Sequence, residues 1–216
     1  MTRRTRLAAV AGGIALTFSL AACGEGGQST PQEPATATAA EQTTDSASQT
    51  EAEDVHNDAD TMFAQMMIVH HEGAIEMADL AVERAESQDV RALAERISAA
   101  QGPEIEQMAS WLETWGEEPA PMGGMEGMDH GDMDMGGMDM EGMSQEEAMA
   151  ALESLSGTEF DQRFLELMIA HHRGAVDMAQ DELDSGENPQ ALDLAQKIIG
   201  DQQAEITEME ELLQSL

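Results

Sequence analysis

Two adjacent histidines occur twice in the chain, at His70-His71 and at His171-His172. The segments around the two pairs match at a constant shift of 101 positions without a gap, so the chain contains an internal duplication. Imidazole is a common ligand for copper, zinc, iron and nickel in proteins. The paired histidines therefore belong to a repeated unit, and metal binding is the chemistry that they indicate.

The elements that carry these histidines are expected to be amphipathic helices. At about 100° per residue, the histidine pair of each half lies on either side of the centre of its apolar stripe. On the following helix of each half, a glutamine and a glutamate fall within the stripe: Gln101, Glu104, Gln202 and Glu205. A carboxylate that is buried alone costs on the order of several kcal/mol or shifts its pKa upward. These polar side chains must therefore satisfy one another or bind a ligand.

Two interpretations of this polar interior are open. In the first, Glu104 and Glu205 accept hydrogen bonds from the histidines, and the network only sets the register of the helices. In the second, the imidazoles coordinate a metal, with the glutamates as ligands or as acceptors that fix the histidine tautomers. The repeated pattern favours the metal. Four methionines accompany the histidines as weaker candidate ligands: Met67, Met77, Met168 and Met178.

A methionine-rich connector, residues 119–143, separates the two halves. Its candidate ligands are Met122, Met125, Met128, His130, Met133, Met135, Met138, Met140 and Met143. Frequent glycine and the lack of helical periodicity exclude a core helix. Thioethers are soft, neutral ligands that suit Cu(I) and Ag(I) and are poor ligands for Mg, Ca or Mn. We therefore expect the connector to capture Cu(I), rather than to be an oxidation-sensitive linker or a promiscuous apolar surface.

Residues 1–22 are typical of a signal peptide, because three arginines precede an apolar run that is too short to span a bilayer. The run ends at Cys23 in a sequence that resembles a bacterial lipobox, so Cys23 is the expected lipidation site; a plain secretory signal is the alternative. Cys23 is the only cysteine, which excludes disulfides and thiolate catalysis. Residues 23–54 predict a disordered tether. We therefore expect an exported protein, held on the outer side of the cytoplasmic membrane by its lipid alone.

The charge of the chain is strongly negative. Its 44 acidic and nine basic residues give a formal net charge of −35 at pH 7. Such a surface repels nucleic acid and anionic lipid and attracts cations, so no nucleic-acid partner is expected. A solvating acidic coat explains most of the charge, and the balance alone is weak support for a metal function.

The folded part, residues 55–216, is predicted to be all-α: an antiparallel four-helix bundle built from two duplicated helical hairpins. Hairpin one covers residues 57–116 and hairpin two covers residues 158–216, with a short helix at 145–156 before the second hairpin. The predicted long helices are 58–86, 88–115, 159–185 and 189–213. Asn57, Ser87, Ser144, Thr158 and Asn188 are the expected N-caps. Gly186 is expected to close the third long helix, and Pro103 to kink the second.

The two histidine segments, residues 67–78 and 168–179, are each followed by a helix with a Gln-x-x-Glu-Ile sequence, and together they resemble the bacterial domain of unknown function 305 family. The resemblance covers roughly residues 55–216 without the connector. It implies a ferritin-like four-helix bundle in an exported protein, with some members associated with copper binding and copper tolerance. By this likeness the inward histidines and methionines would bind the metal.

These observations predict a membrane-tethered copper-binding protein, a buffer or chaperone without catalytic turnover, with copper ions as its ligand and a copper-transfer protein as a conceivable partner. A ferritin-like di-iron or di-manganese enzyme is one alternative, although the Glu-x-x-His pattern of that class is absent and only two inward glutamates stand where it uses four. A cell-surface interaction module with a purely structural polar core is another. Nucleophile chemistry and a phosphate-binding loop have no support.

Overall fold

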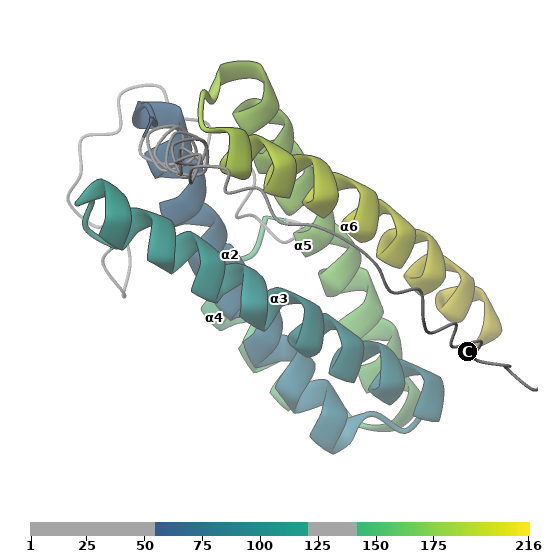
Figure 1. The fold of residues 1–216 in the computed structure, drawn as a ribbon. Coiled ribbons are helices and arrows are strands. Elements are labelled where there is room, and N and C mark those ends of the chain that lie inside the picture. Colours follow the sequence, from purple (N-terminus) through teal and green to yellow (C-terminus); the bar gives the residue numbers. More distant parts are fainter. Residues whose placement is uncertain (1–54, 121–141) are drawn as a thin grey trace, which may run out of the picture. The chain divides into compact units, whose positions relative to one another are not determined.

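The structure, a computed structural model, describes residues 55–120 and 142–216. Within these ranges the protein is all-α, as predicted. The helices are α2 (Asp58–Arg84), α3 (Gln88–Trp115), α4 (Gln145–Glu153), α5 (Gly157–Ser185) and α6 (Pro189–Ser215) (Figure 1). The predicted signal peptide, Cys23, the tether and the connector ligands from Met122 to Met140, with His130 among them, lie outside the described residues.

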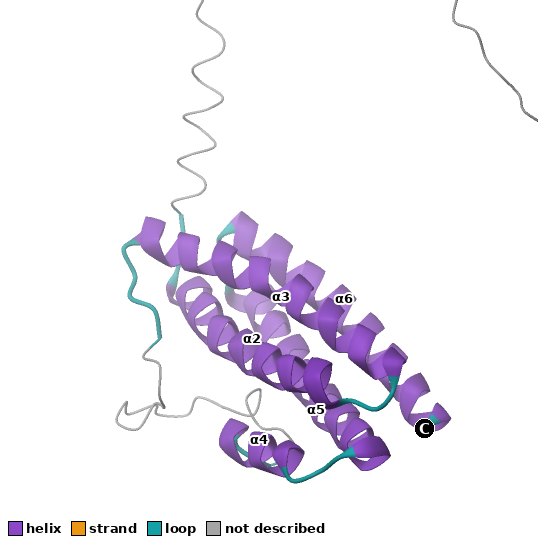
Figure 2. Cartoon of the chain, turned by 90° about the horizontal axis from the view of Figure 1, so that it is seen from below, coloured by secondary structure: helices purple, strands orange, loops and turns teal. Residues whose placement is uncertain are grey.

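The two hairpins pack against each other through their first helices. Helices α2 and α3 form one hairpin, α5 and α6 form the other, α2 packs on α5, and α4 lies against α5 (Figure 2). The Asn57 side chain at the start of α2 donates to the Ser185 carbonyl at the end of α5, and Arg84 at the end of α2 donates to the Leu155 carbonyl before α5. Helices α2 and α5 are therefore antiparallel, which places their central histidines opposite each other.

Side-chain caps fix the starts of four helices. Asn57 and Ser144 each form a reciprocal capping box, with Asp60 and Glu147 respectively. Ser87 accepts a hydrogen bond from Val90, and Asn188 accepts two from the first turn of α6. Such a cap contributes about 1 kcal/mol to helix stability. These four predicted N-caps are confirmed.

The predicted N-cap of α5 is wrong. The helix begins at Gly157, so that Thr158 lies inside it, and the flanking Ser156 makes no side-chain capping bond. The matching signal in the sequence was Asp161, but its carboxylate accepts hydrogen bonds from backbone N–H groups of the α2–α3 turn instead. Asp60, the equivalent residue of α2, makes both a cross-hairpin contact and a local capping box, whereas Asp161 makes the cross-hairpin contact without a capping box at the start of α5.

Two other helices end earlier than predicted. Helix α2 ends at Arg84 rather than at residue 86, and α4 ends at Glu153 rather than at 156. Gly186 follows α5 as predicted, but with a φ of −73° it is not in the left-handed conformation that favours glycine. A side chain at Gly186 would instead collide with the carboxylate of Glu182, so this glycine provides space. Helix α3 continues through Pro103, and the kink there stays a prediction.

The buried apolar side chains form two separate clusters. The Phe164 cluster includes Met77, Leu93, Ile97, Leu152, Phe160, Phe164 and Met168. The Trp111 cluster includes Phe63, Met67, Met108, Trp111, Leu194 and Ile198. Each of the four long helices runs from one cluster to the other. Between the two clusters, each of these helices carries inward polar residues. On α2 and α5 these residues are the duplicated histidines.

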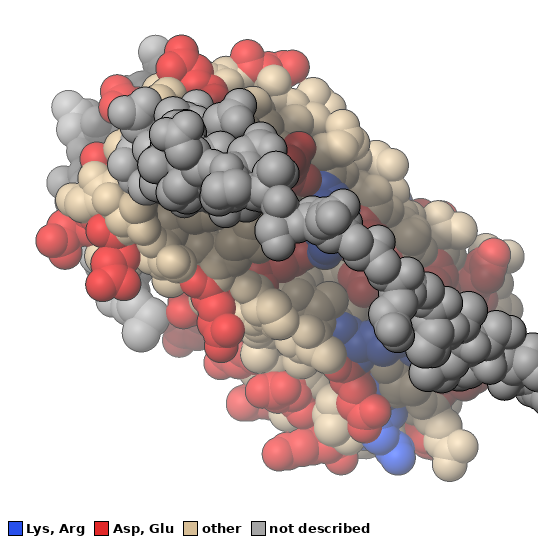
Figure 3. All heavy atoms as spheres, viewed as in Figure 1, with Lys and Arg blue, Asp and Glu red and all other residues tan. Residues whose placement is uncertain are grey.

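Acidic side chains far outnumber basic ones in the sequence. Figure 3 shows acidic side chains spread over the visible face, with few basic ones between them. Among the described helices, none has the length and apolar character that a membrane-spanning segment requires.

Candidate metal centre

A polar layer crosses the bundle between the two apolar clusters. It consists of His70, His71, Gln101, Glu104, His171, His172, Gln202 and Glu205. All of these residues are buried except Glu205, which is half-buried. The inward orientation predicted from helical spacing is therefore confirmed for the histidines and the glutamines. The same helices also carry exposed charged residues, such as Glu72 and Arg173.

Each half of the layer contains one histidine–glutamate pair. His71 Nε2 lies 2.8 Å from Glu104 Oε2, and His172 Nε2 lies 2.7 Å from Glu205 Oε2. Because a carboxylate only accepts, Nε2 carries the proton and donates it in both pairs. In the neutral form of each ring the lone pair is then at Nδ1, and within the described part of the chain neither Nδ1 atom has a hydrogen-bond partner. The pairs fix the tautomer in which a histidine can bind a metal.

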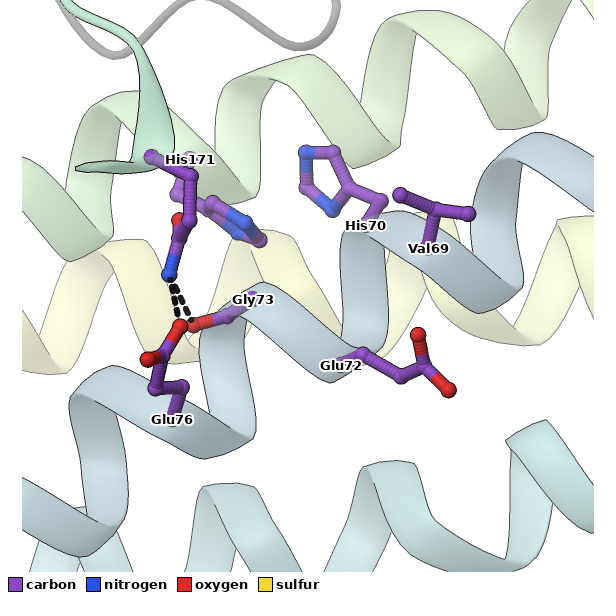
Figure 4. A pocket seen from close by; sticks show the side chains of 7 residues that line it. Val69, His70, Glu72, Gly73, Glu76 and His171 are labelled. Carbon is purple, nitrogen blue, oxygen red and sulfur yellow. Dashed lines mark hydrogen bonds between the residues drawn. The ribbon is translucent and has the colours of Figure 1, made fainter. Parts of the chain in front are cut away.

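The other two histidines meet across the interface of the two hairpins. The rings of His70 and His171 lie 3.6 Å apart between centroids, at an interplanar angle of 40° (Figure 4). Burial, and then the proximity of the other histidines, hold the pKa of His171 well below its usual value. The His171 ring is therefore neutral at physiological pH, and its Nδ1 has no hydrogen-bond partner among the described residues. Neutral imidazole is the form that coordinates metals.

The two halves differ at the glutamates. Lys197 Nζ lies 2.7 Å from Glu104 Oε1 and 2.9 Å from Asp201. Burial opposes ionisation of Glu104, but the hydrogen bonds from His71 and Lys197 outweigh it and lower the pKa of this carboxyl. The equivalent of Lys197 in hairpin one is Arg96, which pairs with Glu208 instead. Lys197 therefore gives Glu104 a second hydrogen-bond partner beside His71.

A cavity of about 350 Å³ opens onto the central histidine pair (Figure 4). Its lining residues are Val69, His70, Glu72, Gly73, Glu76, Gln145 and His171. Gln145, the first residue of α4, crosses the cavity and donates through Nε2 to the Gly73 carbonyl and to Glu76 Oε2, both at 3.0 Å. The central histidines are therefore at the end of a solvent-connected recess.

The candidate methionines lie in the apolar clusters on either side of the layer. Met67 and the partly buried Met178 belong with the Trp111 cluster, and Met77 and Met168 belong to the Phe164 cluster. Met143, the last residue of the connector, packs against the Phe164 cluster, and its sulfur accepts a hydrogen bond of 3.1 Å from Arg163. In residues 55–120 and 142–216, no three His, Cys, Asp or Glu side chains converge on a metal position.

The donor set nevertheless fits a soft metal ion. Buried polar atoms are normally hydrogen-bonded, but several atoms of the polar layer have no partner in the described structure. They include Nδ1 of His71, His171 and His172, together with the amide oxygens of Gln101 and Gln202. Imidazole nitrogens flanked by thioethers suit copper better than the hard cations Mg and Ca.

The protein is a helical bundle of two duplicated hairpins, with a layer of buried histidines at its centre. The chain belongs to the domain of unknown function 305 (DUF305) family, whose model matches residues 60–213. No relative is found among curated proteins.

Solved structures resemble the chain along most of their own length. A DUF305 fragment from Deinococcus radiodurans is 33% identical, with a TM-score of 0.63 over 74% of this chain and 98% of that one. A DUF305 protein from Streptomyces coelicolor, described as a predicted secreted protein, is 32% identical, with a TM-score of 0.61 over 73% and 91%. CopM in its Cu(I)-bound form is 32% identical, with a TM-score of 0.57 over 72% and 96%. CopM is also known in Cu(II)-bound and Ag-bound forms.

Proposed function

We propose that this protein is an exported copper-binding protein, a buffer or chaperone whose bundle holds Cu(I) at the polar layer. The observation that carries the proposal is that, within the described residues, the buried Nδ1 atoms of His71, His171 and His172 have no hydrogen-bond partner, at the centre of an otherwise well-packed bundle. The central ligands would be His70 and His171, whose rings already touch. His71 and His172 would be further ligands, oriented by Glu104 and Glu205.

The likeness to CopM supports copper as the metal, since that protein is known with Cu(I), Cu(II) and Ag bound. The charge state of the layer supports it as well. A cation that enters the buried site meets a neutral imidazole at His171, and it gains two nearby carboxylates that balance its charge.

The connector and the lipid anchor complete the proposal on sequence grounds. The connector methionines would capture Cu(I) from solution, and Cys23 would keep the protein at the outer side of the membrane. Met143 would be a poorer ligand than the other connector methionines, because its sulfur already accepts a hydrogen bond from Arg163.

A di-iron or di-manganese enzyme is less well supported by this site. Such centres use four carboxylates with histidines, and here both layer carboxylates are engaged by histidine N–H groups. The proposed protein binds copper and passes it on without turnover.

The test is a competition titration with Cu(I) under reducing conditions against a chromogenic chelator. The chain from Gly24 onward is compared with two variants: one in which His70 and His171 are changed to alanine, and one in which the connector methionines are changed to serine. His56→Ala is the matched control, because His56 lies outside the polar layer. We expect the His70/His171 variant to lose at least roughly tenfold in affinity at the bundle site, and His56→Ala to lose none. Equal affinity in the two histidine variants would overturn the bundle site.

A further inference from the structure

The two halves of the duplication have the same central histidines, but they differ in the residues at the rim of the cavity beside these histidines. The rim of hairpin one carries Glu72 and Glu76, both exposed, one turn apart on α2. The equivalent positions on α5 are Arg173 and Asp177. The two faces of the same histidine pair therefore present different charges to solvent.

The acidic side is also the side on which the cavity opens. Glu72 and Glu76 line the recess together with His70 and His171, and Figure 4 shows both carboxylates on the α2 ribbon beneath the histidines. On the other side, Arg173 pairs with Glu210 at 3.0 Å. A recess with carboxylates at its rim concentrates cations.

The buried end of the recess offers donors to an arriving cation. His171 is 4% exposed, its Nδ1 lacks a hydrogen-bond partner in the described structure, and its ring lines the cavity. Glu76 is held toward the recess by Gln145, whose Nε2 contacts it at 3.0 Å. Gly73 permits this arrangement, because a Cβ at that position would lie only 2.9 Å from Gln145 Oε1.

We propose that Glu72 and Glu76 form an acidic mouth through which a soft monovalent cation, Cu(I) or Ag(I), reaches the His70–His171 pair. This inference rests on the proposed function and adds the route by which the cation reaches the histidine pair. The route is a single opening on the α2 side, which serves both halves of the duplication. The carboxylates attract and pass the cation, and they are not its final ligands. They therefore raise the association rate and leave the final affinity unchanged.

The test measures Cu(I) association by stopped flow, as transfer from a weak chromogenic indicator, in a background with the connector methionines changed to serine. The variant is Glu72→Gln with Glu76→Gln. The matched control is Asp177→Asn with Asp181→Asn, which removes the same charge from the exposed face of α5. At low ionic strength we expect the mouth variant to associate roughly tenfold more slowly, with the difference shrinking at high salt. The control should associate within about twofold of the parent.

Equal slowing in the mouth variant and the control would overturn the inference, since net charge alone would then account for the rate. An unchanged rate in the mouth variant would overturn it as well. Equilibrium affinity, measured on the same samples, separates this inference from the proposed function. If the parent binds Cu(I) tightly and only the rate prediction fails, the mouth is wrong; if the parent does not bind Cu(I), the proposed function is wrong.

Discussion

Asp60 and Asp161 are equivalent residues of the two halves, and each caps the turn of the opposite hairpin. The Asp60 carboxylate accepts hydrogen bonds from the N–H groups of Glu187 and Asn188 in the α5–α6 turn. The Asp161 carboxylate accepts them from residues 86 and 87 in the α2–α3 turn, at 3.0 and 2.7 Å. Both aspartates are buried. The hairpins therefore lock each other reciprocally, which holds the central histidines in register.

This lock predicts a large loss of stability in Asp161→Ala. The substitution leaves two backbone N–H groups of the turn without their acceptor, and each unsatisfied buried donor costs about 1–3 kcal/mol. We expect the free energy of unfolding, measured by urea denaturation, to fall by about 3 kcal/mol. Asp181→Ala, on the exposed face of α5, is the control and should change stability by less than about 0.5 kcal/mol. Similar losses in the two variants would contradict the cross-hairpin cap.

Glu182 breaks the symmetry of this lock and predicts a pH dependence. Its equivalent is Ala81, while the neighbouring Gly186 replaces Ala85 and makes room for the larger side chain. Burial, and then the Asp60 carboxylate, raise the pKa of Glu182 to about 8. A folded-state pKa above the ordinary 4.5 means that Glu182 stabilises the fold most when protonated, and that this contribution is lost as the pH rises from 4.5 through 8.

Glu182→Gln should remove this fall in the free energy of unfolding with rising pH. The amide keeps an N–H donor for the Asp60 carboxylate and does not titrate. Between about pH 5 and pH 9, we expect the variant to gain roughly 2 kcal/mol relative to the parent, and to equal it near the acid end of this range. Unfolding free energies measured across the range check the prediction. Parallel curves for the two proteins would show that Glu182 is ionised in the fold.

The inequivalence of Glu104 and Glu205 predicts unequal effects of two matched substitutions. Lys197→Met removes the ammonium group that contacts Glu104, whereas Arg96→Met removes an exposed pair with Glu208. Because Lys197 is itself half exposed, we expect a modest extra loss of about 1 kcal/mol in Lys197→Met. The low pKa of Glu104 makes that extra loss largest near neutral pH and smaller as the pH falls through the folded-state pKa. Equal destabilisation in the two variants would show that the halves are equivalent.

The histidine–glutamate pairs predict one tautomer. In the neutral form of each ring, nitrogen NMR of the metal-free protein should find the proton of His71 and of His172 at Nε2 and not at Nδ1. In Glu104→Gln we expect the tautomer preference of His71 to weaken while that of His172 persists. A proton at Nδ1 in the parent would contradict the geometry of both pairs.

The inward face of each helix could be predicted from the sequence, because helical spacing alone places His70, His171 and the layer glutamines among apolar residues. The roles of Asp161, Gly186 and Lys197 could not. Asp161 carries a local capping signal, but its carboxylate serves the other hairpin. Gly186 carries a helix-end signal, but it provides space for Glu182. The contact between Lys197 and Glu104 joins helices that are neighbours only in the folded bundle. Local pattern determines which face a residue takes, and packing between the hairpins determines its partner.

The most direct test of the copper centre is anomalous diffraction at the copper edge from crystals of the Cu(I)-loaded chain. The account predicts a copper peak within the polar layer, at bonding distance from nitrogens of His70 and His171. Copper bound in the crystal but absent from the polar layer would contradict it, and would leave the buried histidines with a structural role alone.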